Sequence, residues 1–186
     1  MNRGTVIFAV LLAALGLGSC AKQSIQTTYD RQAGFIESFI RSKMAVDPTA
    51  TLSRNEGSYR LTINDTLVRN GEDTLRWGGR VALHYACYVL SSASISTSNL
   101  VSTNRKEVAK AAGWSLSDSS QYKLDTLTVD KSLVDGLAKG LIGVQKKDEA
   151  FILFTGQYAF GKVERGTIPA RSALVYQVWI DKIDNE

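Results

Sequence analysis

The feature that most limits the fold of this chain is a series of short apolar segments, separated by turns, with one short helical segment among them. In residues 58–64, Tyr59, Leu61 and Ile63 alternate with polar residues, as in a strand with one buried face. Further strand-like patterns cover residues 81–90, 124–129, 150–154 and 173–180. We therefore expect an α+β fold, in which an antiparallel sheet of five or six strands wraps around one short helix.

The helical segment covers residues 133–141, where Leu133, Leu137 and Leu141 are spaced four residues apart. Gly136 and Gly140 lie in the same segment, although glycine in a helix interior costs roughly 1 kcal/mol relative to alanine. Glycines in such a place indicate that a neighbouring element comes close to the helix backbone. The segment therefore predicts a short helix packed tightly on the sheet.

A longer helix is predicted near the N-terminus, at residues 29–45. Ile36, Ile40 and Met44 follow each other at intervals of four, with phenylalanines beside them, and this spacing forms one apolar stripe. The Asp47-Pro48 step ends the pattern, because the residue before proline avoids the helical conformation. Such a stripe packs either on its own domain or on a second copy of the chain.

The first twenty residues have the pattern of an export signal. Arg3 precedes an apolar run at residues 6–17, which is too short to cross a bilayer as a stable helix. Small residues then lead to Cys20, and this order resembles the lipobox of bacterial lipoproteins, which implies that the Cys20 thiol is lipidated. The alternative is an ordinary signal peptide that contains a cysteine.

Composition excludes several classes of function. The net charge of +4 is small and the charges are mixed along the chain, which argues against a nucleic-acid-binding protein. With one histidine and no close pair of cysteines we expect no metal site, and the sequence lacks a glycine-rich phosphate loop, so no cofactor is expected. Cys87 lies in an apolar strand pattern and is expected to be a buried small hydrophobic residue.

The C-terminal part of the chain resembles the FKBP family of peptidyl-prolyl cis-trans isomerases. The resemblance rests on the order and spacing of the segment VDGLAKGLIGVQKKDEAFILFTGQYAFGKVERGTIPARSALVYQVWIDKI, residues 134–183. Upstream, GGRVALHYACYVL is similar to the first core strand of the family, with its His-Tyr pair. The match covers residues 78–183, with an insertion at residues 91–122, and indicates a divergent bacterial lipoprotein member of the family.

The resemblance divides the chain into four parts. Residues 1–19 are the expected lipoprotein signal peptide and residues 20–28 a flexible tether. Residues 29–77 form an extension with a helix and a strand, and residues 78–186 form the FKBP-like domain.

The resemblance also implies a site. Isomerisation about an X-Pro bond passes through a twisted amide, with a barrier of roughly 18–20 kcal/mol, and needs no nucleophile, metal or proton transfer. A dry, aromatic-lined pocket that holds the proline ring favours the twisted form. The implied catalytic residues are Tyr85, Val134 (through its N–H), Leu137, Phe160, Ile168 and Tyr176, and the implied substrate-binding residues are Leu133, Leu100 and Val101.

Three positions depart from the family pattern. Leu137 replaces a tryptophan that often forms the pocket floor, and Phe160 replaces a tyrosine whose hydroxyl bonds the substrate. Leu100-Val101 falls where the family has a Phe-Asp pair, so the carboxylate is missing. These departures leave an alternative to the isomerase, namely a non-catalytic FKBP-fold chaperone or peptide-binding lipoprotein.

The expected partners and location follow from the same features. The clients are proline-containing polypeptides, and the enzyme would assist the folding of exported proteins. The protein is expected in the cell envelope, held on a bacterial membrane by its lipid and facing the periplasm. A homodimer through the N-terminal helix is a further expectation.

Overall fold

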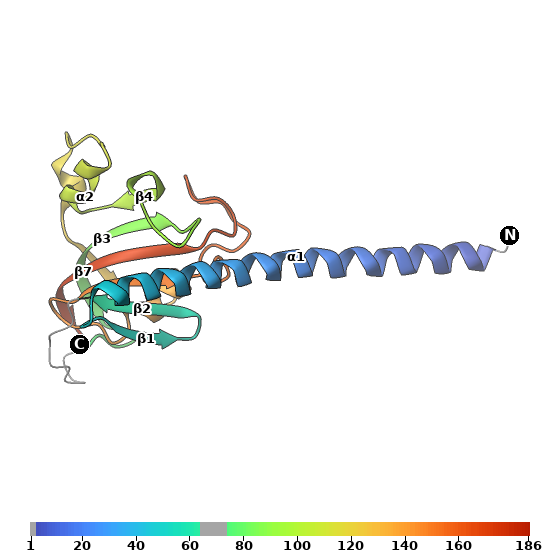
Figure 1. Cartoon of the computed structure of the whole chain (residues 1–186), viewed down its shortest axis with the longest axis horizontal. Coiled ribbons are helices and arrows are strands. Elements are labelled where there is room, and N and C mark those ends of the chain that lie inside the picture. Colours follow the sequence, from blue (N-terminus) through green and yellow to red (C-terminus); the bar gives the residue numbers. More distant parts are fainter. Residues whose placement is uncertain (1–2, 64–73) are drawn as a thin grey trace. The chain divides into compact units, whose positions relative to one another are not determined.

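The computed structural model describes the backbone of residues 3–63 and 74–186, and the side chains of residues 23–63 and 74–186. Residues 1–31 and residues 32–186 form two compact units, and each is considered by itself. Helix α1, Arg3–Val46, extends through the first unit into the second (Figure 1). The polar residues 20–28 are therefore helical, where the sequence predicted a flexible tether. No glycine or proline interrupts that segment, so nothing in it opposes a helix.

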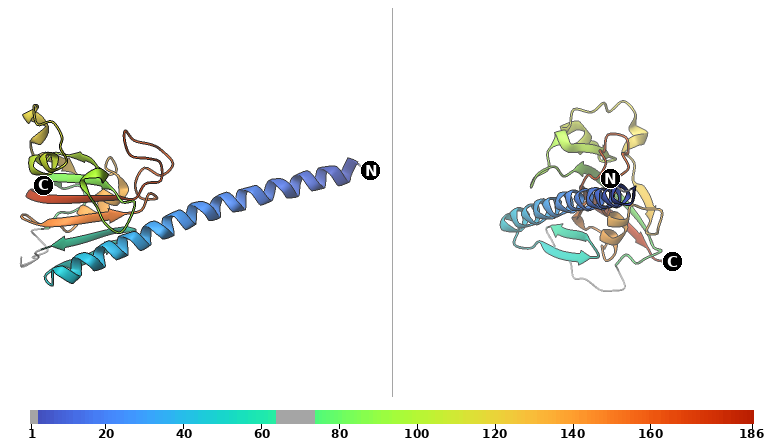
Figure 2. Two further views of the ribbon diagram at one scale, coloured as in Figure 1. Left: turned by 45° about the horizontal axis from the view of Figure 1, so that its top comes forward. Right: turned by 90° about the vertical axis from the view of Figure 1, so that its right-hand side faces the viewer.

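An antiparallel sheet forms the centre of the second unit. Within the described residues it has seven strands in the order β1-β2-β6-β7-β3-β4, and β5 pairs with β3 beside β4. The strands lie side by side in Figure 2. Their bounds are β1 Thr51–Asn55, β2 Ser58–Ile63, β3 Arg80–Val89, β4 Leu100–Thr103, β5 Asp125–Thr128, β6 Glu149–Phe154 and β7 Leu174–Asp184. The predicted α+β class is confirmed, and β1 and β4 are the two strands that the sequence patterns did not indicate.

One face of the sheet packs against the short helix α3, Asp135–Leu141. A Cβ atom at Gly136 would lie 2.2 Å from the Phe154 ring, and one at Gly140 would lie 2.1 Å from Ile152. The predicted close approach is therefore confirmed, because strand β6 leaves no room for a side chain on this side of the helix. The Ser58 hydroxyl, which donates a hydrogen bond of 2.7 Å to the Gly136 carbonyl, fixes the helix on β2 as well.

The opposite face of the sheet is covered by residues 32–46 of α1. Ile36, Phe39 and Ile40 are buried there, and the Phe39 and Phe151 rings meet edge to face with centroids 5.2 Å apart. The apolar stripe of this helix thus packs on its own chain. Met44 completes the sequence pattern but is 41% exposed.

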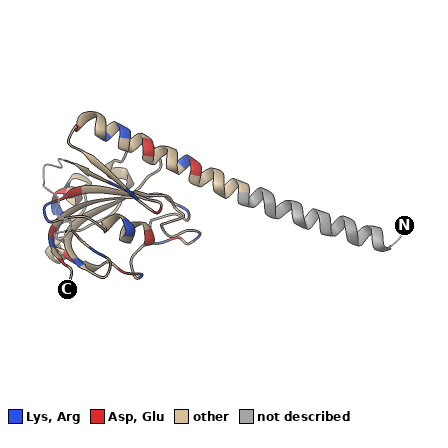
Figure 3. Ribbon diagram, turned by 90° about the horizontal axis from the view of Figure 1, so that it is seen from below, with Lys and Arg blue, Asp and Glu red and all other residues tan. Residues whose placement is uncertain are grey.

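Residues of both charge signs are interspersed along the described part of the chain (Figure 3). No helix in the described part of the chain is both long enough and apolar enough to cross a membrane. Three short elements complete the described part of the domain. The 3₁₀ turn η1, Thr97–Asn99, precedes β4, and helix α2, Lys106–Ala111, and the 3₁₀ turn η2, Ser119–Tyr122, lie between β4 and β5.

Candidate active site

A cavity of about 600 Å³ opens between helix α3 and the inner face of the sheet. Its walls come from β3, β4, β5 and β7, from the residues that lead into α3, and from a loop that precedes β7. Apolar side chains dominate, with a few polar groups at the rim. The lining residues are Leu83, Tyr85, Cys87, Val101, Ser102, Asp125, Leu127, Ser132, Leu133, Val134, Leu137, Arg165, Gly166, Thr167, Ile168, Tyr176 and Val178.

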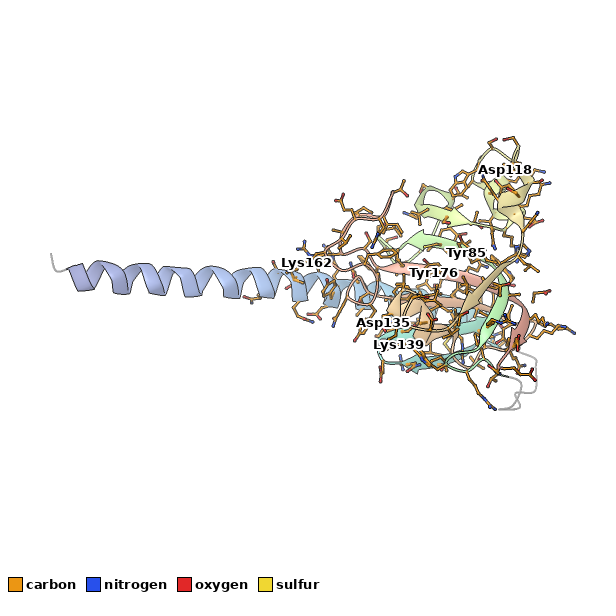
Figure 4. All side chains as sticks on the ribbon, turned by 180° about the vertical axis from the view of Figure 1, so that it is seen from behind. Tyr85, Asp118, Asp135, Lys139, Lys162 and Tyr176 are labelled. Atoms are coloured by element: carbon orange, nitrogen blue, oxygen red, sulfur yellow. The ribbon has the colours of Figure 1, made fainter. Side chains whose placement is uncertain are left out.

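Two tyrosines on neighbouring strands form the aromatic part of this lining (Figure 4). The ring centroids of Tyr85 on β3 and Tyr176 on β7 are 6.1 Å apart, with their planes inclined by 42°. Phe154 lies behind Tyr176, nearly parallel to it at 6.1 Å, and is fully buried. Because each ring is packed against the next, the cavity wall is fixed before any ligand binds.

Tyr85 sits where the partner of β3 changes from β5 to β4. Asn104 fills this gap: its Oδ1 accepts a hydrogen bond from the Tyr85 N–H at 2.6 Å, and its Nδ2 donates to the carbonyls of Leu83 and Lys123. The side chain of Asn104 is buried, and these bonds use its acceptor and its amide donors. The Tyr85 backbone is thereby held at the junction of two strands that do not meet each other.

The Tyr85 hydroxyl lies 3.0 Å from the Ser102 hydroxyl. This contact depends on a β-bulge in β4: Cys87 pairs with Ser102 and Tyr88 pairs with Leu100, so Val101 is the extra residue. The bulge places Leu100 and Ser102 on opposite faces of the sheet, although they are two residues apart. The polar partner of the tyrosine at the cavity wall is therefore a serine hydroxyl.

Cys87 lies in the cavity wall next to Tyr176, and the two side chains form a hydrogen bond. Burial raises the pKa of the Cys87 thiol to about 12, and burial also raises the pKa of the Tyr176 hydroxyl. Both groups are neutral at physiological pH. Since the thiolate is the reactive form of cysteine, Cys87 is not a nucleophile here.

Ile168 reaches the cavity from the loop before β7. The N–H groups and carbonyls of Arg165 and Ile168 bond each other at 3.0 and 2.9 Å, which closes a two-residue hairpin over Gly166 and Thr167. Gly166 has a φ of +57°, a conformation that favours glycine. Pro169 follows Ile168 but does not begin the strand, since β7 starts at Leu174.

Gln32 of α1 joins the two ends of the segment that carries this hairpin. Its Oε1 accepts a hydrogen bond from the Gly156 N–H at 2.9 Å, and its Nε2 donates to the Arg171 carbonyl at 2.6 Å. The side chain is 7% exposed. Gly156 and Arg171 lie so close that a Cβ on the glycine would be 2.2 Å from the Arg171 carbonyl oxygen. The position of the loop is thus coupled to the helix on the far face of the sheet.

The structure brings seven of the nine pocket residues indicated by the sequence around one cavity: Tyr85, Val101, Leu133, Val134, Leu137, Ile168 and Tyr176. Val134 precedes α3 as its N-cap residue. Within the described residues, its amide N–H has no hydrogen-bond partner, so it remains able to bind a peptide carbonyl.

Leu100 and Phe160 do not line the cavity. The bulge at Val101 turns Leu100 into the core on the α1 side, where it is buried, so the cavity lacks the Leu100 side chain that the resemblance implied. Phe160 lies at a turn closed by the bond from the Gly161 N–H to the Gly156 carbonyl. Its ring packs on the core and faces the Arg165 guanidinium at 5.8 Å.

Of the lining residues that sequence reasoning missed, Ser102 and Cys87 adjoin the two tyrosines. Alternation along β3 could have indicated Cys87, because Tyr85 and Cys87 are two residues apart and face the same side. No sequence signal marks Ser102, since its orientation depends on the bulge. The side chain of Cys20, the expected lipidation site, lies outside the described residues.

An antiparallel sheet half wrapped around a short helix, with an apolar cavity between them, is the architecture of FKBP domains. The sequence model of the FKBP-type peptidyl-prolyl cis-trans isomerases matches residues 71–181, more than half of the chain, and the chain belongs to this family. No curated protein matches the sequence.

Two solved structures show the same fold. The crystal structure of the three FKBP domains of wheat FKBP73 aligns with a TM-score of 0.55 and 12% identity, over 74% of this chain and 52% of that one. The crystal structure of FkpA from Escherichia coli aligns with a TM-score of 0.54 and 14% identity, over 100% of this chain and 74% of that one. This chain thus spans about half the length of the wheat structure. At these identities the likeness concerns the fold.

Proposed function

We propose that this protein catalyses cis-trans isomerisation of X-Pro bonds in polypeptides and so assists the folding of exported proteins. The observation that carries the proposal is the cavity of about 600 Å³ beneath two tyrosine rings, large enough for a proline and part of its neighbours. The Cys87 thiol in its lining is protonated, and this chemistry requires no nucleophile.

The pocket supports catalysis by favouring the twisted amide. In the planar state the X-Pro amide is a strong dipole stabilised by water, and the apolar walls replace that water. Leu133, Leu137 and Ile168 would hold the proline ring by apolar contact. The Val134 N–H would bind a carbonyl of the peptide and so fix its orientation.

A non-catalytic chaperone is the second candidate, and a specific observation favours it. Ser102 stands beside the Tyr85 hydroxyl and carries no charge, and Leu137 is not aromatic. The cavity could then bind apolar segments of unfolded chains without lowering the barrier to rotation.

A protease-coupled assay on short X-Pro peptides tests the first proposal. We expect isomerisation faster than in buffer, in proportion to the protein concentration. Equal rates with and without folded protein, together with suppressed aggregation of an unfolded client that lacks proline, would support the chaperone instead.

The location and assembly are proposals of the same kind. The signal-like N-terminus supports attachment to a bacterial membrane through lipid on Cys20, with the domain facing the periplasm. Mass spectrometry of the mature N-terminal peptide tests the lipidation.

The long helix α1 supports a homodimer. Sedimentation of the chain from residue 20 onward, compared with the chain from residue 32 onward, tests the dimer.

A further inference from the structure

A loop of residues 157–170, between β6 and β7, forms part of the rim of the cavity. Lys162, which belongs to this loop, is labelled in Figure 4. The loop begins after Gly156 and ends before Arg171, and these two residues pack directly against each other. It is therefore a compact loop with closed ends, a type of loop that often carries function.

The closed ends of this loop are under backbone strain. Arg171 has a φ of +61°, in the left-handed region that residues other than glycine rarely adopt, and its N–H donates a hydrogen bond to the Gly161 carbonyl. Such a conformation persists only where the surrounding contacts enforce it. The contacts that hold Arg171 therefore matter for the position of the whole loop.

Gln32 supplies such contacts from helix α1. Its side-chain amide accepts a hydrogen bond from the Gly156 N–H and donates one to the Arg171 carbonyl, so one planar group binds both ends of the loop. Gln32 is buried and lies four residues before Ile36, on the face of the helix that packs against the sheet. Both bonds therefore require this part of α1 to be docked on the sheet.

The two halves of the loop have different anchors. In the first half, the Tyr158 carbonyl accepts a hydrogen bond of 2.9 Å from the Gly136 N–H of α3. In the second half, the hairpin that carries Ile168 is closed by bonds within itself, and Ile168 is three residues before Arg171. The bond from Gln32 to the Arg171 carbonyl is thus close to Ile168 in the chain and holds the second half of the loop.

We propose that Gln32 is a positioning residue for the isomerisation, which keeps Ile168 at the cavity and makes the activity depend on the docking of α1. The proposal rests on the proposed function for the reaction. It adds a residue outside the cavity that acts through Ile168, and it implies that a partner or a force that pulls α1 off the sheet lowers the activity.

Protease-coupled kinetics of helix variants test the proposal. Gln32→Met removes both hydrogen bonds and keeps the length of the side chain, and it should lower kcat/KM by up to about tenfold, the loss expected for Ile168→Ser. Gln32→Asn is a second variant, which keeps the amide but is too short to reach both ends of the loop. Ile40→Val is the matched control and should leave kcat/KM unchanged, because it weakens the packing of the same helix face and does not touch the loop.

A double variant distinguishes positioning from a general loss of stability. If Gln32 acts through Ile168, the combination of Gln32→Met and Ile168→Ser is no slower than Ile168→Ser alone. Independent effects would multiply instead, to a loss of about a hundredfold, and would overturn the proposal. Unchanged rates in both Gln32 variants would also overturn it.

Methyl NMR of Ile168 separates this result from the proposed function. Ile168 lines the cavity together with Tyr85 and Tyr176, so we expect the ring currents of the tyrosines to displace its methyl signals from their positions in the unfolded chain. Gln32→Met should move these signals toward the unfolded positions, and Ile40→Val should not. Moved signals in a protein that isomerises no peptide would remove the function and leave the coupling of helix and loop. Unmoved signals would overturn the coupling, even in an active isomerase.

Discussion

At the scale of single residues, Cys87 shows how burial sets the chemistry of the cavity. The thiol is 1% exposed, hydrogen-bonded to Tyr176, and has a pKa of about 12 in place of its ordinary value of 9.0. Burial is the main cause, since removal from water disfavours the charged thiolate. The thiol is therefore inert in the fold, and the burial that its apolar strand pattern predicted is confirmed.

This raised pKa predicts a pH dependence of stability. Below about pH 9 the thiol is protonated in both the folded and the unfolded chain, so its full contribution is present. Between pH 9 and 12 only the unfolded chain loses the proton, and the free energy of unfolding falls by up to about 1.4 kcal/mol per pH unit for this group. Urea unfolding from pH 7 to 10.5 measures the fall, and Cys87→Ala should show a shallower one. Parallel curves for the two proteins would contradict the burial of the thiol.

At the scale of elements, residues 32–46 of α1 are part of the domain core. Ile36, Phe39 and Ile40 cover the face of the sheet opposite the cavity, and Gln32 binds both ends of the segment that carries Ile168. The helix thus stabilises the sheet through its apolar residues. Through Gln32 it also positions the loop that carries Ile168 to the cavity.

The packing of α1 predicts that Phe39→Ala is strongly destabilising. Phe39 is 2% exposed, and removal of a buried phenylalanine side chain costs about 3–5 kcal/mol, which is a large part of the stability of a typical domain. Met44→Ala is the control on the same helix, since Met44 is 41% exposed, and it should change stability by about 0.5 kcal/mol or less. Denaturant unfolding measures both, and a similar effect of the two variants would show that the helix does not cover the sheet.

Elements with a strong periodic pattern could be predicted from the sequence, and those shaped by tertiary contacts could not. The α3 helix and strands β2, β3, β5, β6 and β7 have clear apolar spacing, and the glycines of α3 correctly indicated a close neighbour. Strand β4 has only four residues beside a serine-rich segment, and its bulge depends on pairing with β3. For this reason Leu100 was expected in the pocket, while Ser102 was missed.

At the scale of the whole molecule, the cavity depends on segments far apart in the chain. Tyr85 and Tyr176 come from paired strands about ninety residues apart in the sequence. Ile168 is held by a hairpin within a segment whose ends, Gly156 and Arg171, are bound to Gln32. The family resemblance supplied these positions before the structure did, because its fixed spacings carry information on tertiary contacts that periodicity lacks. The cavity therefore combines an apolar wall on the sheet with a short loop at its rim.

In the proposed function, this wall and this loop lower the barrier to rotation about an X-Pro bond. Two-dimensional NMR exchange spectroscopy on an X-Pro peptide, with a small molar fraction of the protein, measures the interconversion directly. Ile168→Ser should lower the catalysed rate by about tenfold, since it removes roughly 1.4 kcal/mol of apolar contact from the cavity. Val163→Ser in the same loop is the control, because Val163 is 53% exposed and does not line the cavity.

We expect exchange peaks between the cis and trans forms at mixing times where the peptide alone shows none. The peaks should be retained with Val163→Ser and much reduced with Ile168→Ser. Exchange no faster than in buffer, with the protein folded by near-ultraviolet circular dichroism, would contradict the proposed function.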